Sequence, residues 1–270
     1  MHDPNLLRSI RFAAVLLALG TFDVAAAAPD SALKAAVADP GRTADFVARD
    51  AVRHPAEELS FFGIKPDMTV VELWPAGGYW TEILGPYLAK SGTYYVALEF
   101  TDGEKDNYHW RSRMAAEKDR LGTIHETTLV AGHIDIAPPG SADLVLTFRN
   151  LHNWMRSSGY ETQALAACFT ALKPGGILGI EEHRGRNDKP QDPKAVDGYV
   201  REDYTIALAK KAGFVLVAKS EMNANPKDTK DWPKGVWTLP PTLALGEKDR
   251  EKYIAIGEGD NFVLKFRKPK

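Results

Sequence analysis

Hydrophobic and polar positions between residues 69 and 181 form a repeating series of short apolar runs and longer amphipathic stretches. An apolar run bounded by turn residues predicts a buried strand, and apolar residues three or four positions apart predict a helix. The predicted strands are 69–73, 93–98, 126–130, 143–147 and 177–181, and the predicted helices between them are 79–88, 107–121 and 160–172. Strands that alternate with helices favour a mostly parallel sheet with right-handed crossovers.

The C-terminal part of the chain continues this pattern. A helix is predicted at 201–212, because Gly213 is a usual residue just past a helix end. Two further strands are predicted at 214–219 and 261–266. The segment between them, 222–258, is longer than a compact connection and carries two tryptophans and a Pro-Pro pair. We expect this insertion to be a lid over a site, and packing on the sheet edge as plain structure stays equally open.

The N-terminal residues have the pattern of a secretory signal peptide. Arg8 and Arg11 precede the apolar stretch 12–19, and small residues follow at 25–28. The apolar stretch is shorter than the roughly 20 residues that a membrane span needs, although an uncleaved anchor stays open. We therefore expect residues 1–28 to be removed and the chain to be exported to the periplasm, with no stable membrane insertion after cleavage.

Composition and charge narrow the remaining possibilities. At 270 residues, 44% of them hydrophobic, the chain fits one α/β domain with extensions. Residues 29–65 form a predicted helical extension, in which Pro55 suits the start of a short helix, and 66–270 form the domain. The net charge of −2, without a run of one sign, indicates no nucleic-acid partner. The single Cys168 excludes an intramolecular disulfide and a cysteine-rich zinc site. The oligomeric state stays open.

The stretch 70–81 carries the first candidate chemistry. It reads as a strand, a glycine-containing turn and the start of a helix, the unit with which nucleotide-binding α/β folds begin. Backbone N–H groups in such a turn can meet an oxygen-rich ligand, and Gly77 and Gly78 let the backbone approach closely. Ligands of these folds bind beyond the carboxyl ends of the strands. Glu99 lies there, 21 residues beyond Gly78, at a spacing typical of an acid that binds ribose hydroxyls.

The same stretch resembles the first motif of class I S-adenosylmethionine (SAM) dependent methyltransferases, written E/D-x-G-x-G-x-G. Aligned on Glu72, the three glycine positions fall on Trp74, Ala76 and Gly78, so one glycine is present. Residues 142–154 resemble the fourth family motif, and the Leu-Lys-Pro-Gly-Gly turn that begins at residue 172 closely matches the fifth. The resemblance covers about residues 60–220. More narrowly, the chain resembles an exported bacterial group of predicted methyltransferases that carries Glu-Leu-Trp-Pro and Glu-His-Arg-Gly.

The resemblance implies a fold, a cofactor and a set of contacts. The fold is a Rossmann-like, doubly wound, mostly parallel seven-stranded sheet in which the last two strands form an antiparallel hairpin, and the cofactor is SAM. His133 stands where the family usually has an aspartate for the adenine amino group, and Asp135 could serve instead. The indole of Trp74 could face the sulfonium or block the pocket. The expected cofactor-binding residues are Glu72, Trp74, Ala76, Gly77, Gly78, Tyr79, Glu99, His133 and Asn150.

Methyl transfer is an in-line displacement, in which the protein aligns the reactants and sometimes removes a proton. Histidine has an ordinary pKa near neutrality, so we expect His183 as the general base and His152 as the second candidate, with a backbone-bonded loop histidine as the alternative for each. Arg149 and Arg184 are expected to bind an anionic substrate group, and structural ion pairs with neighbouring acids stay open. The histidines and their neighbours form no convincing ligand set, so no metal is predicted.

The predicted function is SAM-dependent methyl transfer to an unidentified small molecule, whose accepting atom the sequence leaves open. The alternative is a non-catalytic extracytoplasmic protein that binds a small molecule and reuses the methyltransferase fold. This alternative avoids one difficulty, which is that SAM is made in the cytoplasm. A nicotinamide-dependent oxidoreductase is disfavoured, because Trp74 and Ala76 occupy places where a dinucleotide fingerprint needs glycine.

Overall fold

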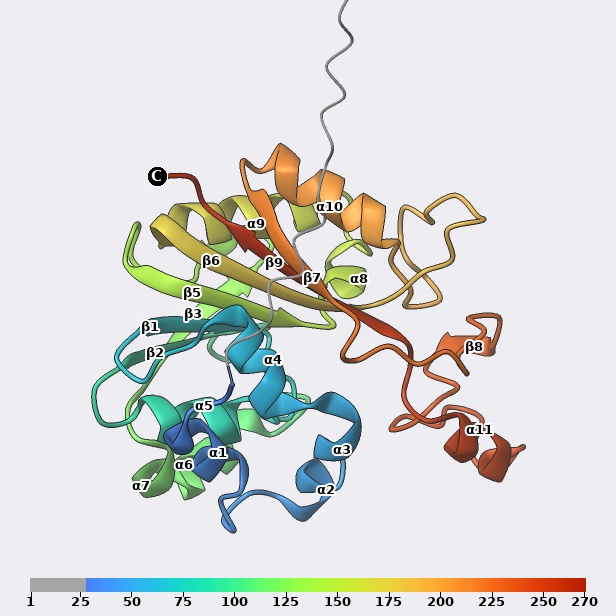
Figure 1. Cartoon of the computed structure of the whole chain (residues 1–270), viewed down its shortest axis with the longest axis horizontal. Coiled ribbons are helices and arrows are strands. Elements are labelled where there is room, and N and C mark those ends of the chain that lie inside the picture. Colours follow the sequence, from blue (N-terminus) through green and yellow to red (C-terminus); the bar gives the residue numbers. More distant parts are fainter. Residues whose placement is uncertain (1–27) are drawn as a thin grey trace, which may run out of the picture.

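A computed structural model describes residues 28–270 and contains one eight-stranded sheet (Figure 1). The strand order is β4-β3-β2-β1-β5-β6-β9-β7. The strands are β1 Thr69–Leu73, β2 Thr93–Leu98, β3 Ile124–Val130, β4 His133–Asp135, β5 Ala142–Phe148, β6 Leu172–His183, β7 Val215–Ser220 and β9 Asn261–Arg267, while β8 Pro233–Val236 lies outside the sheet.

The pairing of the strands confirms the predicted fold class. β1 pairs in parallel with β2 and β5, and the parallel core continues from β2 to β3 and from β5 to β6. β9 is antiparallel to both β6 and β7, which is the expected C-terminal hairpin. The eighth strand is β4, which pairs antiparallel with β3 after a turn at Gly132. Three residues are too few to show an alternating pattern, so the sequence predicts seven strands instead of eight.

Eleven helices belong to the described part of the chain. They are α1 Ser31–Val37, α2 Ala44–Val47, α3 Asp50–Arg53, α4 Pro55–Phe62, α5 Thr81–Leu88, α6 Trp110–Ala116, α7 Lys118–Leu121, α8 Leu151–Trp154, α9 Tyr160–Ala171, α10 Glu202–Lys211 and α11 Arg250–Ile256. Pro55 stands at the start of α4, as its fixed φ and missing N–H favour. The single helix predicted at 107–121 begins three residues later and divides at Glu117.

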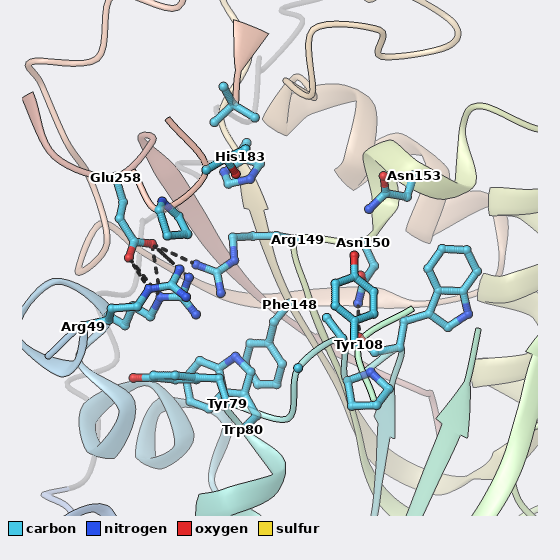
Figure 2. A pocket seen from close by; sticks show the side chains of 18 of the residues that line it. Arg49, Tyr79, Trp80, Tyr108, Phe148, Arg149, Asn150, Asn153, His183 and Glu258 are labelled. Atoms are coloured by element: carbon cyan, nitrogen blue, oxygen red, sulfur yellow. Dashed lines mark hydrogen bonds and ion pairs between the residues drawn. The ribbon is translucent and has the colours of Figure 1, made fainter. Parts of the chain in front are cut away.

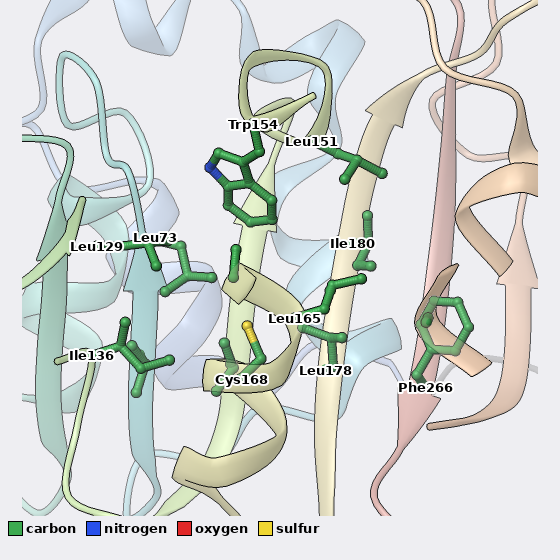
Figure 3. Close-up of a cluster of buried hydrophobic side chains, with 14 of the residues drawn as sticks. Leu73, Leu129, Ile136, Leu151, Trp154, Leu165, Cys168, Leu178, Ile180 and Phe266 are labelled. Carbon is green, nitrogen blue, oxygen red and sulfur yellow. The ribbon is translucent and has the colours of Figure 1, made fainter. Parts of the chain in front are cut away.

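Each face of the sheet has its own hydrophobic core. α9 covers one face, where Leu165 and Cys168 pack with strand residues such as Leu73 and Leu178 (Figure 3). α1, α4, α5 and α6 cover the other face. Gly179 of β6 shows how closely α4 approaches, because a Cβ atom there would lie 2.7 Å from the Phe62 ring. Helices on both faces are the arrangement of a doubly wound sheet.

The N-terminal residues and the insertion at 222–258 bear on two predictions, the export of the chain and the lid over a site. The predicted signal peptide at 1–28 lies outside the described residues except for its last position. From residue 28 onward, every helix is too short or too polar to cross a membrane. The insertion at 222–258 contains β8 and α11. Several of its side chains reach the cavity described next, at Val236, Trp237, Pro240, Pro241, Thr242 and Glu258.

Candidate functional site

A cavity of about 250 Å³ lies beyond the carboxyl ends of β1, β5 and β6 (Figure 2). Its walls come from the loop after β1, the loop after β5, His183 at the end of β6, the region of α2 and α3, and the insertion. This is the edge at which open α/β sheets bind ligands. The parallel pairing of β1 with β5, and of β5 with β6, brings these separate loops to one place.

The loop after β1 has an unusual backbone. φ is +50° at Trp74, +49° at Ala76 and +89° at Gly78, so all three motif glycine positions are left-handed. Residues other than glycine rarely adopt this conformation, which persists only where the surroundings hold it. Here the Trp74 N–H donates to the Ala97 carbonyl at 2.8 Å, and the Gly78 N–H donates to the Pro75 carbonyl at 2.9 Å. The chain therefore keeps a glycine-type loop while carrying larger residues in it.

This loop offers backbone donors to the cavity. Ala76 and Gly77 line the cavity, and their N–H groups have no hydrogen-bond partner within residues 28–270. Ala76 and Gly77 are half-buried, so these unpaired N–H groups are open to water or to the oxygen atoms of a ligand. Gly77 is fixed from behind by Arg113, whose Nη1 donates to the Gly77 carbonyl. The loop can therefore bind oxygen atoms of a ligand.

The indole of Trp74 is anchored at the core beneath α9. Its Nε1–H donates to the Leu129 carbonyl at 2.7 Å, and its ring centroid lies 6.0 Å from those of both Trp154 and Tyr160. The ring is half-buried, and the residue also forms part of the cavity wall. Trp74 is thus fixed by packing and by a hydrogen bond.

Two buried carboxyl groups lie behind the loop. Glu72 accepts hydrogen bonds from Tyr94 and from Thr81, the latter at 2.8 Å, and its Oε1 has no partner in the described structure. Burial raises the pKa of Glu72 to about 7. Glu99 follows β2 directly; its Oε2 is buried and also lacks a described partner, and burial raises the pKa of this carboxyl. An orphaned carboxyl oxygen can accept a hydroxyl donor of a ligand.

His152 and His183 lie side by side at the other end of the cavity, with ring centroids 5.4 Å apart. His152 Nδ1 lies 2.8 Å from Glu182 Oε1, and its backbone N–H donates to Glu182 Oε2 at 3.1 Å. His183 Nδ1 lies 2.7 Å from Asn261 Oδ1. Because Asn261 donates its amide to Glu181, its oxygen must accept from His183, which assigns the proton to Nδ1. Neither Nε2 has a hydrogen-bond partner in the described part of the chain.

The charges of this group follow from its surroundings. Burial alone would raise the pKa of Glu182, but His152 and His183 together hold it below its usual range, so Glu182 is ionised. Burial lowers the pKa of His183 to about 3, so this imidazole is neutral. One donor atom from each of the three residues lies within 4.8 Å of the others. Glu182 already accepts three hydrogen bonds, and the two free imidazole nitrogens fall short of the three protein ligands of catalytic zinc sites. The arrangement favours acid–base chemistry.

Solved structures with this architecture include SAM-dependent methyltransferases. A SAM-dependent methyltransferase from Aquifex aeolicus matches with a TM-score of 0.53 and 16% identity, over 82% of this chain and 93% of that one. CrArsM, an arsenic(III) methyltransferase from Chlamydomonas reinhardtii, matches with 0.51 and 17%, over 90% and 75%. The cyclase SpnF matches with 0.53 and 15%, over 88% and 91%. No protein-family model and no curated protein matches the chain.

The chain has the methyltransferase fold. The sequence identities are too low to carry an activity across, and they do not test the narrower exported group. Within this fold, the loop at 74–78 and the edge of the sheet beyond β1, β5 and β6 occupy the ligand-binding side that the sequence predicted.

Three predicted site residues, Asn150, Tyr79 and Arg184, are engaged by the protein itself, and a fourth, His133, is exposed to solvent. Asn150 donates its amide to the Leu73 and Trp74 carbonyls, at 2.9 and 3.2 Å, and so ties the loop after β5 to the loop after β1. The Tyr79 hydroxyl donates to Asp50 at 2.7 Å. The other two lie away from the cavity: His133 is exposed in β4, and Arg184 is held by carboxylates, at 2.7 Å from Glu202 and 3.2 Å from Asp260.

Several cavity residues escaped the sequence prediction. Glu182 is not among the predicted site residues, although it accepts hydrogen bonds from His152, which lines the cavity. Arg49 and Arg53 contact Glu258, more than 200 residues away in the chain. Their spacing of four residues, which places two guanidinium groups on one helical face, was an available signal. The glycines that flank Glu258 were another, because they mark a turn that presents an acid.

Proposed function

We propose that this chain binds SAM in the cavity and transfers the methyl group to a small-molecule acceptor. The observation that carries the proposal is the left-handed backbone at all three motif glycine positions, beside unpaired N–H groups at the cavity wall. His152 lines the same cavity, and Glu182 is hydrogen-bonded to it. The methyltransferase fold supports the cofactor class far better than it supports any particular acceptor.

The residues present fit SAM at two places. The N–H groups of Ala76 and Gly77 would hold its oxygen atoms, and the orphaned Oε2 of Glu99 would accept from its ribose hydroxyls. Glu99 does not itself line the cavity, but its charge acts on Tyr108, which does, so the two side chains lie near each other. When bound, SAM supplies an electrophilic methyl group on a sulfonium.

For acceptors that must lose a proton, we assign the base to His152. Glu182 fixes the His152 ring through Nδ1, which leaves Nε2 as the proton acceptor. His183 comes second, in reverse of the order expected from sequence, because burial lowers its pKa to about 3 and makes it a weak base. Its role is then to orient the acceptor through Nε2. Arg149 would bind an anionic part of the acceptor.

The insertion at 222–258 would act as the lid. Trp237 and the Pro240–Pro241 pair line the cavity near His152, whose ring centroid is 5.8 Å from that of Trp237. Apolar groups at this position would exclude water from the reacting atoms. We also propose that residues 1–28 direct export, as their sequence pattern predicts.

The alternative function is binding without turnover. It is favoured by the Trp74 indole, a large fixed ring at the position of the first motif glycine. The likeness to SpnF, a cyclase, also illustrates that this fold carries more than one chemistry. The alternative expects the chain to bind a metabolite and to transfer no label from methyl-labelled SAM in the presence of cell extract.

Isothermal titration with S-adenosylhomocysteine tests the proposal. We expect binding, and we expect Glu99→Gln to weaken it about tenfold, since a charged acceptor for a diol is lost. Glu104→Gln is the matched control, because Glu104 is an exposed acid in the same region whose carboxylate accepts from Thr101. Absence of S-adenosylhomocysteine binding to the folded chain would reject the enzyme assignment.

A further inference from the structure

Three arginines converge on one carboxylate at the end of the cavity nearest α3 (Figure 2). Arg49 Nε lies 2.7 Å from Glu258 Oε1, Arg53 Nη2 lies 3.0 Å from Oε2, and Arg149 Nη1 lies 3.4 Å from Oε2. Arg53 belongs to α3 and Arg49 directly precedes it, Arg149 follows β5, and Glu258 ends the insertion. All four side chains line the cavity.

The charges at this end do not balance. Guanidinium groups stay charged at any ordinary pH. Glu258 compensates one of the three, and Glu181, whose Oε2 lies 3.6 Å from Arg149 Nε, compensates at most one more. The third nearby acid is Glu58, which accepts from Asn223 and forms no ion pair with any of the three arginines in the described structure; burial and then the charge of Glu181 also raise its pKa well above the usual range. At least one positive charge therefore remains without a counterion in the described structure.

Each guanidinium also keeps a free donor. Arg49 and Arg53 both use Nε and Nη2 on Glu258, and Arg149 uses Nη1. The remaining nitrogens, Nη1 of the first two and Nη2 of Arg149, have no partner among residues 28–270 and are not sealed off from solvent. Donors from three separate side chains therefore stay available at one end of one cavity.

A purely structural role, in which these ion pairs only fasten the insertion to the N-terminal helices, does not explain why three arginines are present. Two arginines and Glu258 would suffice to fasten the insertion to the N-terminal helices. A third desolvated cation raises the cost of burial unless a further anion pairs with it. Arg149 is nevertheless aimed here from a left-handed backbone at φ +60°, with its N–H donating to the Glu181 carbonyl at 2.7 Å. Strain of this kind is characteristic of functional sites.

We propose that Arg49, Arg53 and Arg149 form a subsite for an oxyanion group of the methyl acceptor, a carboxylate, phosphate or sulfate, which binds beside Glu258. The inference rests on the proposed function, whose acceptor class it supplies. The carboxylate of the cofactor has the same chemistry, and the experiment below separates the two sources. The acceptor is favoured as the source for two reasons. Arg149 lies in the short connection between β5 and α8, the helix that carries His152. On the cofactor side, the N–H groups of Ala76 and Gly77 already offer donors.

Sulfate is the probe, titrated into the full chain and followed by calorimetry and by the midpoint of thermal unfolding. Sodium chloride of equal ionic strength is the reference, because screening alone acts on every exposed charge. We expect sulfate to bind and to raise the midpoint. Arg49→Gln should weaken sulfate binding about tenfold, the effect of losing one charge-assisted donor pair.

Two further variants separate binding from folding. Glu258→Gln removes the competing carboxylate, so it should tighten sulfate binding about tenfold even if it lowers the unfolding midpoint. Arg156→Gln is the matched control, because Arg156 is an exposed guanidinium 5.0 Å above the Trp237 ring, and it should leave sulfate affinity unchanged. Sulfate that acts no differently from chloride, or binds Arg49→Gln as well as the unaltered chain, overturns the subsite.

The source of the oxyanion is tested with two nucleosides. S-adenosylhomocysteine carries a carboxylate, and 5′-methylthioadenosine lacks it. We expect sulfate to bind in the presence of either one. If saturating S-adenosylhomocysteine prevents sulfate binding and methylthioadenosine does not, the arginines hold the cofactor's carboxylate and the acceptor assignment is overturned. Failure of both nucleosides to bind would instead reject the proposed function, while the sulfate titration still reports on the subsite.

Discussion

Two residues that line the cavity, His183 and Glu72, give the stability a pH dependence of opposite sign. Burial lowers the pKa of His183 to about 3 and raises that of Glu72 to about 7. In the unfolded chain these groups return to ordinary values, about 6.5 for histidine and about 4.3 for glutamate. The free energy of unfolding therefore depends on pH through both groups between pH 7.5 and pH 5.

The sign differs between the two. Folded His183 is neutral, so below about pH 6.5 the unfolded chain takes up a proton that the folded chain does not, and stability falls. Between pH 7.5 and pH 5 this loss is about 2 kcal/mol. Glu72 is protonated in the folded chain below about pH 7, whereas the unfolded carboxyl is still ionised at pH 5, so acidification over the same range adds about 2 kcal/mol. The two contributions nearly cancel in the unaltered chain.

Single substitutions separate the contributions of His183 and Glu72 to the free energy of unfolding. Urea unfolding at pH 7.5 and pH 5 measures each contribution. On acidification, His183→Asn should gain about 2 kcal/mol relative to the unaltered chain, and Glu72→Gln should lose about 2 kcal/mol. Groups common to all chains drop out of this comparison. His125→Asn, at an exposed histidine that does not line the cavity, is the control variant with which His183→Asn is compared. If His183→Asn changes in parallel with this control, the assignment of a neutral buried imidazole is wrong.

Three further substitutions test the base and the anchoring of the loop. His152→Asn should lower turnover at least 100-fold, because general-base catalysis contributes roughly that much, while the affinity for S-adenosylhomocysteine measured by calorimetry stays the same. Trp74→Phe and Tyr160→Phe each remove one of two donors to the same Leu129 carbonyl, at 2.7 and 2.6 Å. Each should cost about 1 kcal/mol in urea unfolding, and the double variant should cost about 1–3 kcal/mol more than their sum, because the buried carbonyl then lacks both donors.

Each of these tests has an outcome that contradicts it. His133→Asn is the control for His152→Asn, because His133 lies on an exposed strand outside the cavity, and it should keep full turnover. Equal losses in both variants would remove His152 from the proton transfer. Strictly additive costs for Trp74→Phe and Tyr160→Phe would mean that the two side chains do not share the Leu129 carbonyl in solution.

The parallel core of the fold could be predicted because its strands are buried on both faces and read as continuous apolar runs. β1, β2 and β5 lie at their predicted positions within one residue, and the hairpin of β7 and β9 is also confirmed. β4 escaped because a three-residue strand has no periodicity. The helix predicted at 107–121 divides at Glu117, a break that the apolar pattern does not mark.

Part of the candidate site could be predicted from local sequence patterns, and part depends on contacts between residues far apart in the chain. A strand followed by a turn locates Glu72, Ala76, Gly77 and Glu99 by sequence spacing alone. The contacts among Arg49, Arg53 and Glu258 depend on how the insertion folds back over the N-terminal helices, more than 200 residues away in sequence. Spacing carries no information about such a contact.

The backbone at Trp74 explains how a motif can lose its glycines and keep its shape. A left-handed conformation costs a residue with a side chain roughly 1–2 kcal/mol, which the surroundings must offset. The indole does so through its hydrogen bond to Leu129 and its contacts with Trp154 and Tyr160. Both interactions fix the ring against the core beneath α9. The residue that replaces the first motif glycine is therefore the one that holds this loop in its glycine-type shape.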